Sequence, residues 1–90
     1  MKPAETLKTA ASLVSGDRAK QYGDYTTLHQ RAADLWSAYL KVEVKPEDVA
    51  LCMALLKVAR NEMGQVKPDN GVDASAYVAL WAAMMEDKNA

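Results

Sequence analysis

The sequence predicts an all-α protein, an antiparallel four-helix bundle that self-associates. Apolar side chains recur at helical spacing in four segments, roughly residues 5–22, 27–41, 46–63 and 70–86. The connections between these segments are short, which favours antiparallel packing of neighbouring helices. Half of the 90 residues are apolar, so one small domain carries more apolar surface than its own core needs.

The first predicted helix, residues 5–22, has an inward stripe of small and branched side chains: Leu7, Ala10, Ala11 and Val14. Continued at the same spacing, this stripe reaches Arg18 and then Tyr22. Gly16 weakens the helix by about 1 kcal/mol relative to alanine. Gly23 suits a left-handed stop, so we expect the helix to end there.

The second predicted helix, residues 27–41, follows three candidate N-cap residues, Asp24, Thr26 and Thr27. Thr27 forms a capping box with Gln30 in this interpretation. One side of the helix is expected to be buried: Leu28, Ala32, Leu35, Trp36, Tyr39 and Leu40. The following link, "KVEVK", is too short to build a sheet and is predicted to be a connector.

The third predicted helix, residues 46–63, is apolar nearly all round its middle, which is typical of a central helix. Pro46 suits its first turn, and Cys52 is expected to be a small core residue. One stripe is small and then polar: Ala50, Ala54, Lys57 and Asn61. Such a stripe either permits the close approach of another helix or opens a cleft.

The fourth predicted helix, residues 70–86, directs Tyr77, Leu80, Trp81 and Met84 inward, with Asp73 at the head of the same stripe. A carboxylate there is partly desolvated unless it meets a cation, a metal or backbone amides. Alternatively, Asp69 or Asp73 caps the helix and Asn70-Gly71 forms a turn. Capping and ligand binding are compatible, so both interpretations stay open.

Alternating helix directions place the Gly23 turn and the Lys67–Gly71 loop at the same end of the bundle. Unusual polar residues should gather there: Arg18, Tyr22, Lys57, Arg60, Asp69, Asn70 and Asp73. Cations beside acids can bind a phosphate together with its Mg²⁺. They can equally form a salt-bridged lid that only closes the bundle.

Three segments carry an ordered set of motifs: "DRAKQYGDYTTLH" has R-x-x-x-Y-G-D, "LLKVAR" has K-x-x-R, and "DNGVDASAY" has D-N-x-x-D-x-x-x-Y. This set resembles a group of short phage-encoded proteins of unassigned function. That group looks like a shortened relative of the MazG-like all-α nucleotide pyrophosphohydrolases. The resemblance covers roughly Leu7 to Met85.

The enzymes hold Mg²⁺ with an E-E-x-x-E motif and an E-x-x-D motif, and they assemble as dimers or tetramers. The resemblance therefore implies an Mg²⁺ cofactor, with the segment Asn70 to Asp73 matching E-x-x-D and asparagine replacing glutamate. The first motif has no clear counterpart in this sequence. This departure bears on catalysis more than on nucleotide binding, because substrate phosphates can supply the remaining Mg²⁺ ligands.

Two functions follow from these observations. In the first, the protein binds a nucleotide. Its Mg²⁺ is held by Asp69, Asn70 and Asp73, and Tyr22 contacts the base. The phosphates are bound by the cations Lys57, Arg60 and Arg18. In the second, a non-enzymatic helical protein binds and modulates a host or phage protein. The alanine- and methionine-rich fourth helix favours the second function and a homo-oligomer.

Other function classes find no support in the sequence. The net charge of −1 with interspersed signs does not predict DNA binding. The one histidine, His29, has no nucleophile pattern around it that predicts a hydrolase triad. No stretch has the character of a signal peptide or membrane span, so we expect a cytoplasmic protein, in the host cell if phage-encoded.

Overall fold

The computed structural model describes residues 1–15, 24–62 and 66–88 of the chain. Those residues form helices and no strand, which confirms the all-α class. The described helices are α1 (Pro3–Leu13), α3 (Tyr25–Leu40), α4 (Pro46–Glu62) and α5 (Pro68–Lys88). Among these helices, none has the length and apolar character needed to cross a membrane.

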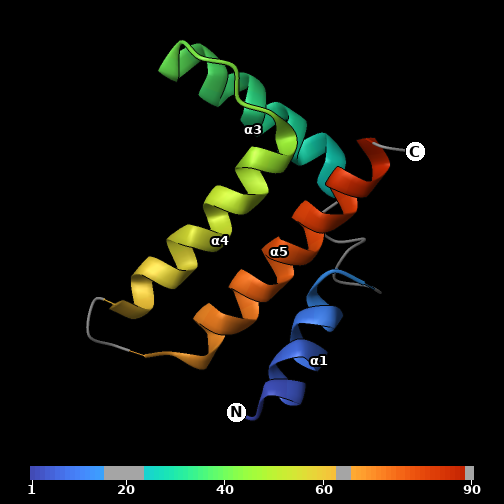
Figure 1. Cartoon of the computed structure of the whole chain (residues 1–90), viewed down its shortest axis with the longest axis vertical. Helices are drawn as coiled ribbons and strands as arrows, with labels where there is room; N and C mark the ends of the chain where they lie inside the picture. Colours follow the sequence, from blue (N-terminus) through green and yellow to red (C-terminus); the bar gives the residue numbers. More distant parts are fainter. Residues whose placement is uncertain (16–23, 63–65, 89–90) are drawn as a thin grey trace.

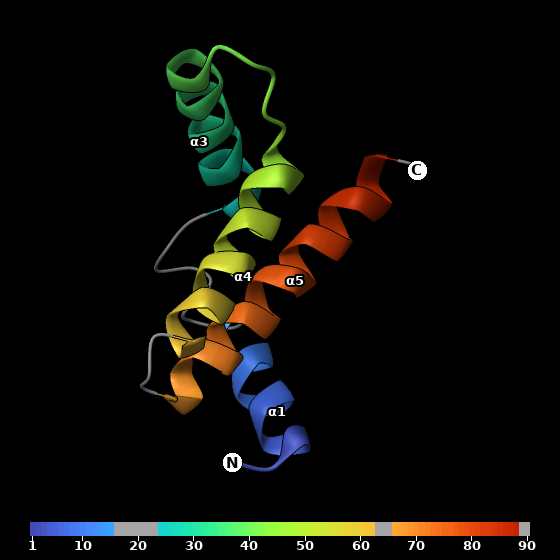
Figure 2. The ribbon, with the colours of Figure 1, turned by 60° about the vertical axis from the view of Figure 1, so that its left-hand side comes forward.

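The arrangement differs from the closed antiparallel bundle predicted from the sequence (Figures 1 and 2). α4 and α5 form a long antiparallel pair. α1 lies against the first half of α5 and runs in the same direction as α5, not against it. α3 packs on the beginning of α4 and projects beyond that end of the pair. The predicted alternation is therefore seen only for α4 and α5.

Small side chains form the buried contacts between the helices. Ala50 and Ala54 are buried in α4, as the small half of the predicted stripe requires for close approach to α5. Between α1 and α5, Ala10 packs with Val72 and Ala76. No large side chain of the described residues is completely buried. The core is thus thin, and many larger apolar side chains remain at the surface.

α1 is shorter than predicted, because it ends at Leu13 instead of continuing toward residue 22. The hydroxyl of Ser12 donates to the Thr9 carbonyl at 2.6 Å, and that of Ser15 donates to the Ala11 carbonyl at 2.7 Å. Such side-chain bonds compete with the backbone for the last carbonyls of a helix. The remainder of the predicted helix, residues 16–22, lies outside the described residues.

α3 begins two residues earlier than predicted, at Tyr25, because Asp24 is its N-cap. The Asp24 carboxylate accepts a hydrogen bond from the backbone N–H of Thr26 at 3.0 Å and one from the Thr27 hydroxyl at 3.1 Å. The predicted capping box of Thr27 with Gln30 is therefore wrong. Gln30 instead donates to Asp34 on the next turn.

The connector after α3 is confirmed as an irregular link. Lys41 ends the helix in the left-handed region, with φ of 59°. Ser37 then ties the link back, because its hydroxyl oxygen accepts from the Val44 backbone N–H at 2.8 Å and donates to the Val44 carbonyl at 3.2 Å. Pro46 begins α4, as predicted.

The predicted buried side of the second helix is largely wrong. α3 buries the side that carries His29 and Ala33, while most of the expected inward residues are exposed: Leu28, Leu35, Tyr39 and Leu40. The physical reason is that α3 contacts only one end of α4, so the contact covers a narrow part of its apolar arc. Cys52, expected in the core, is exposed for a similar reason on α4.

α5 is longer than predicted at both ends. It begins at Pro68, so Asn70 and Gly71 lie in its first turns and do not form the predicted turn. Proline is favoured at the first helical position because it has no N–H to leave unpaired. At the other end, the helix continues to Lys88 where the sequence predicts a frayed tail.

Candidate functional site

The polar half of the predicted α4 stripe faces α5. Lys57 Nζ lies 3.2 Å from Asp73 Oδ2, with side-chain exposures of 17% and 33%. The Asp73 carboxylate, predicted to be partly desolvated, has thus met a cation. Because a half-buried charge is costly without a partner, the pair holds α4 and α5 together at this level.

Next to the ion pair, two asparagines close the same end of the helix pair. Asn70 is 5% exposed, and its Nδ2 donates to Asn61 Oδ1 at 2.9 Å. The same Asn61 oxygen also accepts the backbone N–H of Lys67 at 3.3 Å. Asn61 lies one turn after Lys57 on α4, and its partner Asn70 lies nearly one turn before Asp73 on α5. This is the order that an antiparallel pair of helices requires.

The other predicted site residues do not take part in these contacts or lie outside the described residues. Arg60 on α4 and Asp69 in the first turn of α5 are exposed. Arg18 and Tyr22 lie outside the described residues. The structure therefore brings four of the seven predicted residues to one end of the α4–α5 pair. Lys57 contacts Asp73, Asn70 contacts Asn61, and the exposed Asp69 is next to Asn70 on the same helix turn.

Metal ligands do not converge at this end. In the described part of the chain, no three carboxylate, histidine or cysteine side chains are grouped as a metal ion would need. The Asp73 carboxylate is paired with the Lys57 ammonium, and the Asn70 amide is turned toward Asn61. An Mg²⁺ ion at Asp73 would have to displace that ammonium, so the Mg²⁺ site stays a prediction.

The beginning of α3 does not lie at this end of the molecule. Thr26 and Gln30 share a hollow with Lys88, at the end of α5. Asp69 and Lys88 are 19 residues apart on one helix, a distance of about 28 Å. The expectation that the start of the second helix shares one end of the molecule with the Lys67–Gly71 loop is therefore wrong. His29 Nδ1 instead donates a hydrogen bond to the Tyr25 carbonyl at 2.7 Å, and the His29 ring meets the Tyr77 ring edge-on, with centroids 6.4 Å apart.

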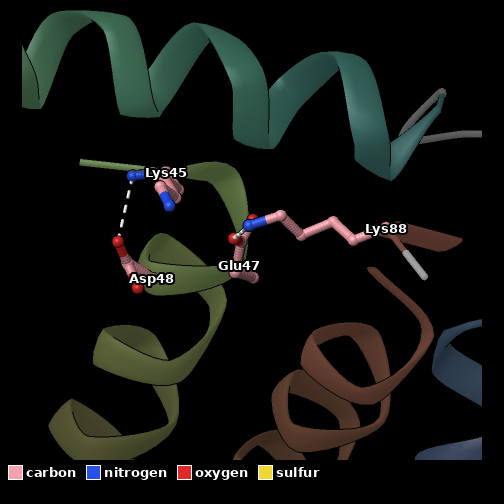
Figure 3. A network of polar contacts seen from close by, with 4 residues as sticks. All are labelled: Lys45, Glu47, Asp48 and Lys88. Atoms are coloured by element: carbon pink, nitrogen blue, oxygen red, sulfur yellow. Dashed lines mark hydrogen bonds and ion pairs between the residues drawn. The ribbon is translucent and has the colours of Figure 1, made fainter. Parts of the chain in front are cut away.

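A second polar cluster, not predicted from the sequence, lies at the beginning of α4 (Figure 3). The Glu47 carboxylate is buried and accepts a hydrogen bond from Lys88 Nζ at 2.5 Å. Lys45 contributes its backbone N–H to the Asp48 carboxylate at 3.0 Å, which caps the helix. The contact between Lys88 and Glu47 ties the end of α5 to the first turn of α4.

Each partner of this ion pair shifts the protonation of the other. The hydrogen bond from Lys88 lowers the pKa of Glu47 below its ordinary value of 4.5, against the opposing effect of burial. The same bond raises the pKa of Lys88 above 10.5. Both groups are therefore charged at neutral pH. Proline followed by two acids marked a helix start in the sequence, but no local pattern linked Glu47 to a residue 41 positions later.

Beside this pair lies an open hollow of about 660 Å³. Its walls come from one side of α3 between Thr26 and Ser37, the link after it, the first turn of α4 and the end of α5. Its charged lining residues are four acids, Asp34, Glu43, Glu47 and Asp87, and two lysines, Lys45 and Lys88, so negative charge is in excess around the hollow.

Comparison with known proteins places the chain among phage proteins. The profile described as "Domain of unknown function (DUF6378)" matches residues 5–85. The "Gene 55 protein" of Mycobacterium phage L5 is 43% identical over 79 residues, which cover 87% of this chain and 51% of that protein. The "Gene 55 protein" of Mycobacterium phage D29 is 32% identical over 81 residues, 90% of this chain and 54% of that protein.

The chain thus spans about half the length of the curated relatives it matches. No solved structure matches it. The family profile covers all the described helices apart from the outermost residues of α1 and α5. The Lys57–Asp73 pair lies within it, whereas Lys88 of the second polar cluster lies beyond it. The chain belongs to the DUF6378 family of phage-encoded domains, whose function is unknown.

Proposed function

We propose that this protein acts without catalysis, by binding a host or phage protein through the outer face of α4. This face is defined by Leu51, Leu55 and Val58, which follow one another at spacings of four and three residues. All three are exposed on a side of α4 turned away from Ala50 and Ala54, the residues that meet α5. A row of this kind presents the anchor spacing on which a partner helix packs.

The observation that carries this proposal is the inverted placement of apolar side chains. The buried contacts are made mainly by alanine and valine, whereas leucines of α3 and α4 are at the surface. A compact monomer of 9.8 kDa exposes about 5,200 Å². This chain exposes 6623 Å². The excess of roughly 1,400 Å² is larger than the approximately 800 Å² that each partner contributes to a standard interface.

The polar end of the α4–α5 pair is consistent with the same proposal. Lys57 is paired with Asp73, and Asn61 is hydrogen-bonded to Asn70. This arrangement fits the salt-bridged lid that is the alternative prediction from the sequence. Their arrangement is explained by holding two helices together and calls for no ligand.

Affinity purification from host lysate and from phage-infected cells tests the proposal. We expect one protein to be retained by the wild type and by Asp73→Ala, and to be lost with Leu55→Glu. The purified partner should then bind the wild type in calorimetry and bind the Leu55→Glu variant at least tenfold more weakly. Equal recovery with wild type and Leu55→Glu would refute the α4 surface, and loss with Asp73→Ala would direct attention to the polar end.

A nucleotide is the second candidate ligand, as the MazG-like resemblance predicts. The favouring observation is that Lys57 and Asp73 form an ion pair that is only partly exposed, and that the exposed Arg60 lies one turn from Lys57 on α4. Mg²⁺ would bind at Asp69, Asn70 and Asp73 once phosphate oxygens supply further ligands and take up Lys57. Arg18 and Tyr22 would complete the phosphate and base contacts.

Melting curves with a panel of deoxynucleoside triphosphates, with and without Mg²⁺, test this second function. A bound nucleotide at one hundred times its Kd stabilises the folded state by about 2.7 kcal/mol. We expect that shift to disappear in Lys57→Ala, and any pyrophosphate released to require Mg²⁺. An unchanged melting temperature with every nucleotide would exclude both binding and hydrolysis under those conditions.

Self-association also belongs to the proposed mode of action. The excess exposed surface is sufficient for one standard contact and for most of a second one. The radius of gyration, 13.8 Å, also exceeds the approximately 12 Å expected for a compact chain of this length. Both quantities support the proposal that association completes the burial of apolar surface.

A further inference from the structure

We infer that the hollow beside Glu47 is the docking site for a basic segment of the partner protein. A lysine or arginine of that segment takes the place of Lys88 on the Glu47 carboxylate. This inference rests on the proposed protein-binding function and adds the chemistry of the partner. Three features of the hollow carry it: its lining, its unbalanced charge and the ammonium group that it already holds.

The lining of the hollow suits a side chain that has a charged head on an apolar stem. The volume of about 660 Å³ lies within the roughly 300–1,000 Å³ of sites that enclose a ligand. Val44, Pro46 and Met84 supply apolar surface. The polar wall is one side of α3, where four residues follow at spacings of four, four and three over about 17 Å: Thr26, Gln30, Asp34 and Ser37.

The negative charge around the hollow is not neutralised from within the described chain. Glu43 and Asp87 are exposed and form no ion pair with another described residue. The Asp34 carboxylate accepts a hydrogen bond from the uncharged Gln30 amide only. Carboxylates that are held around one hollow without their own cations attract a positively charged partner.

The hollow already binds an ammonium group, that of Lys88. Glu47 is 7% exposed, and its carboxylate accepts from Lys88 Nζ at 2.5 Å. Figure 3 shows the two side chains pointing toward each other beneath α3. A carboxylate this buried requires a cation. Glu47 is thus a position that recognises an ammonium or guanidinium group.

Lys88 is placed so that another cation can replace it. Its side chain is 45% exposed and belongs to the last turn of α5. It also lies beyond the residues that the family profile matches, whereas Glu47 lies within them. When Lys88 withdraws into water, the four acids of the hollow face Lys45 alone. An incoming lysine or arginine then keeps Glu47 paired and also meets the acids that Lys88 leaves without a partner.

The hollow continues the partner surface on α4. Glu47, Leu51, Leu55 and Val58 follow one another at spacings of four, four and three residues, so the carboxylate begins the apolar row. Glu47 and Leu55 are about 12 Å apart along the helix. The partner segment that fits both is therefore an amphipathic helix with basic residues about two turns from its apolar anchors.

NMR titration of the full chain with the peptide acetyl-KAKAK-amide at low ionic strength tests the inference. We expect the backbone amides around the hollow to shift, and no shift with the same peptide carrying glutamate in place of lysine. Glu47→Gln should weaken binding by about fivefold, because one ion pair is lost. Lys88→Ala should strengthen it by about threefold, because the internal competitor is removed.

Exposed acids provide a second test that does not depend on the buried pair. The double variant Asp34→Asn/Asp87→Asn should bind the basic peptide about fivefold more weakly. Glu86→Gln is the matched control, because this exposed acid is next to Asp87 but does not line the hollow. It should bind as the wild type does. Circular dichroism should show equal helix content in all the variants.

Opposite effects at Glu47 and Lys88 separate docking from a purely structural ion pair. Unchanged or weaker binding in Lys88→Ala would overturn the exchange, and equal binding by the wild type and the Asp34→Asn/Asp87→Asn variant would overturn the site. If a partner is captured and lost with Leu55→Glu while the peptide does not bind, this inference fails and the proposed function stands. If the peptide binds in the expected pattern and no partner is captured, only the proposed function fails.

Discussion

The hydrogen bond between Asn61 and Asn70 should contribute measurably to stability, because one of its partners is almost completely buried. Asn61→Ala removes an oxygen that accepts from Asn70 Nδ2 at 2.9 Å and from the Lys67 backbone N–H at 3.3 Å. Lys67 is exposed, so its N–H regains a water molecule. Asn70 is 5% exposed, so its amide does not.

The expected loss follows from that difference in burial. A buried polar group left without a partner costs about 1–3 kcal/mol, and the midpoint of about 2 kcal/mol applies here. The better helix propensity of alanine returns about 0.5 kcal/mol. The net loss is therefore about 1.5 kcal/mol, a substantial part of the roughly 5–13 kcal/mol available to a domain of this length.

Urea unfolding followed by tryptophan fluorescence measures this loss, since Trp36 lies on α3 and Trp81 on α5. With a denaturant slope of about 1–1.5 kcal/mol/M, the midpoint should fall by roughly 1–1.5 M. The double variant Asn61→Ala/Asn70→Ala leaves no buried amide unpaired. It should lose about 1 kcal/mol less than the sum of the two single variants.

Gln30→Ala is the matched control. The Gln30 side-chain amide also donates at 2.9 Å, to Asp34 Oδ1, but that bond is exposed to water. The control should therefore change the free energy of unfolding by no more than about 0.5 kcal/mol. If Asn61→Ala costs no more than Gln30→Ala, or if the Asn61 and Asn70 effects add, burial of this bond does not stabilise the α4–α5 pair.

Three further predictions concern stability. Because Lys88 lowers the pKa of Glu47, the pair stabilises the fold above pH 4.5 and loses this effect as the pH falls through the pKa of Glu47 in the folded state. The unfolding free energy of Glu47→Gln should therefore be lower than that of the wild type at pH 7, and it should change less with pH between about pH 5 and 3. An equal dependence on pH in the two proteins would contradict this. Ala54→Leu should destabilise by about 1–3 kcal/mol in urea unfolding, because this position is 4% exposed between close helices; an unchanged midpoint would mean that the contact has room. Lys41→Gly should raise the melting temperature by several degrees, about 1 kcal/mol, because φ of 59° costs a lysine and not a glycine; a lower melting temperature would show that Lys41 makes a stabilising contact.

Much of the fold and of the polar end could be predicted from the sequence, because the relevant information is local. Helical periodicity located α3, α4 and α5 within two residues of their observed bounds, although not the end of α1, and Pro46 marked the start of α4. The stripe of Ala50, Ala54, Lys57 and Asn61 predicted a close approach that the buried alanines and the Lys57–Asp73 pair confirm. These features follow from the 3.6-residue repeat alone, which decides what shares one face of a helix.

Periodicity shows which side of a helix is apolar but not how much of that side a neighbour covers. Only the tertiary structure decided that His29 and Ala33 are the buried residues of α3, that Leu35 stays exposed, and that α1 runs parallel to α5. It also joined Glu47 to Lys88 across 41 positions, at the end of α5 expected to fray. Contacts of this kind depend on the direction and crossing of whole helices, which are set by the sum of many weak packing terms and by no single local motif.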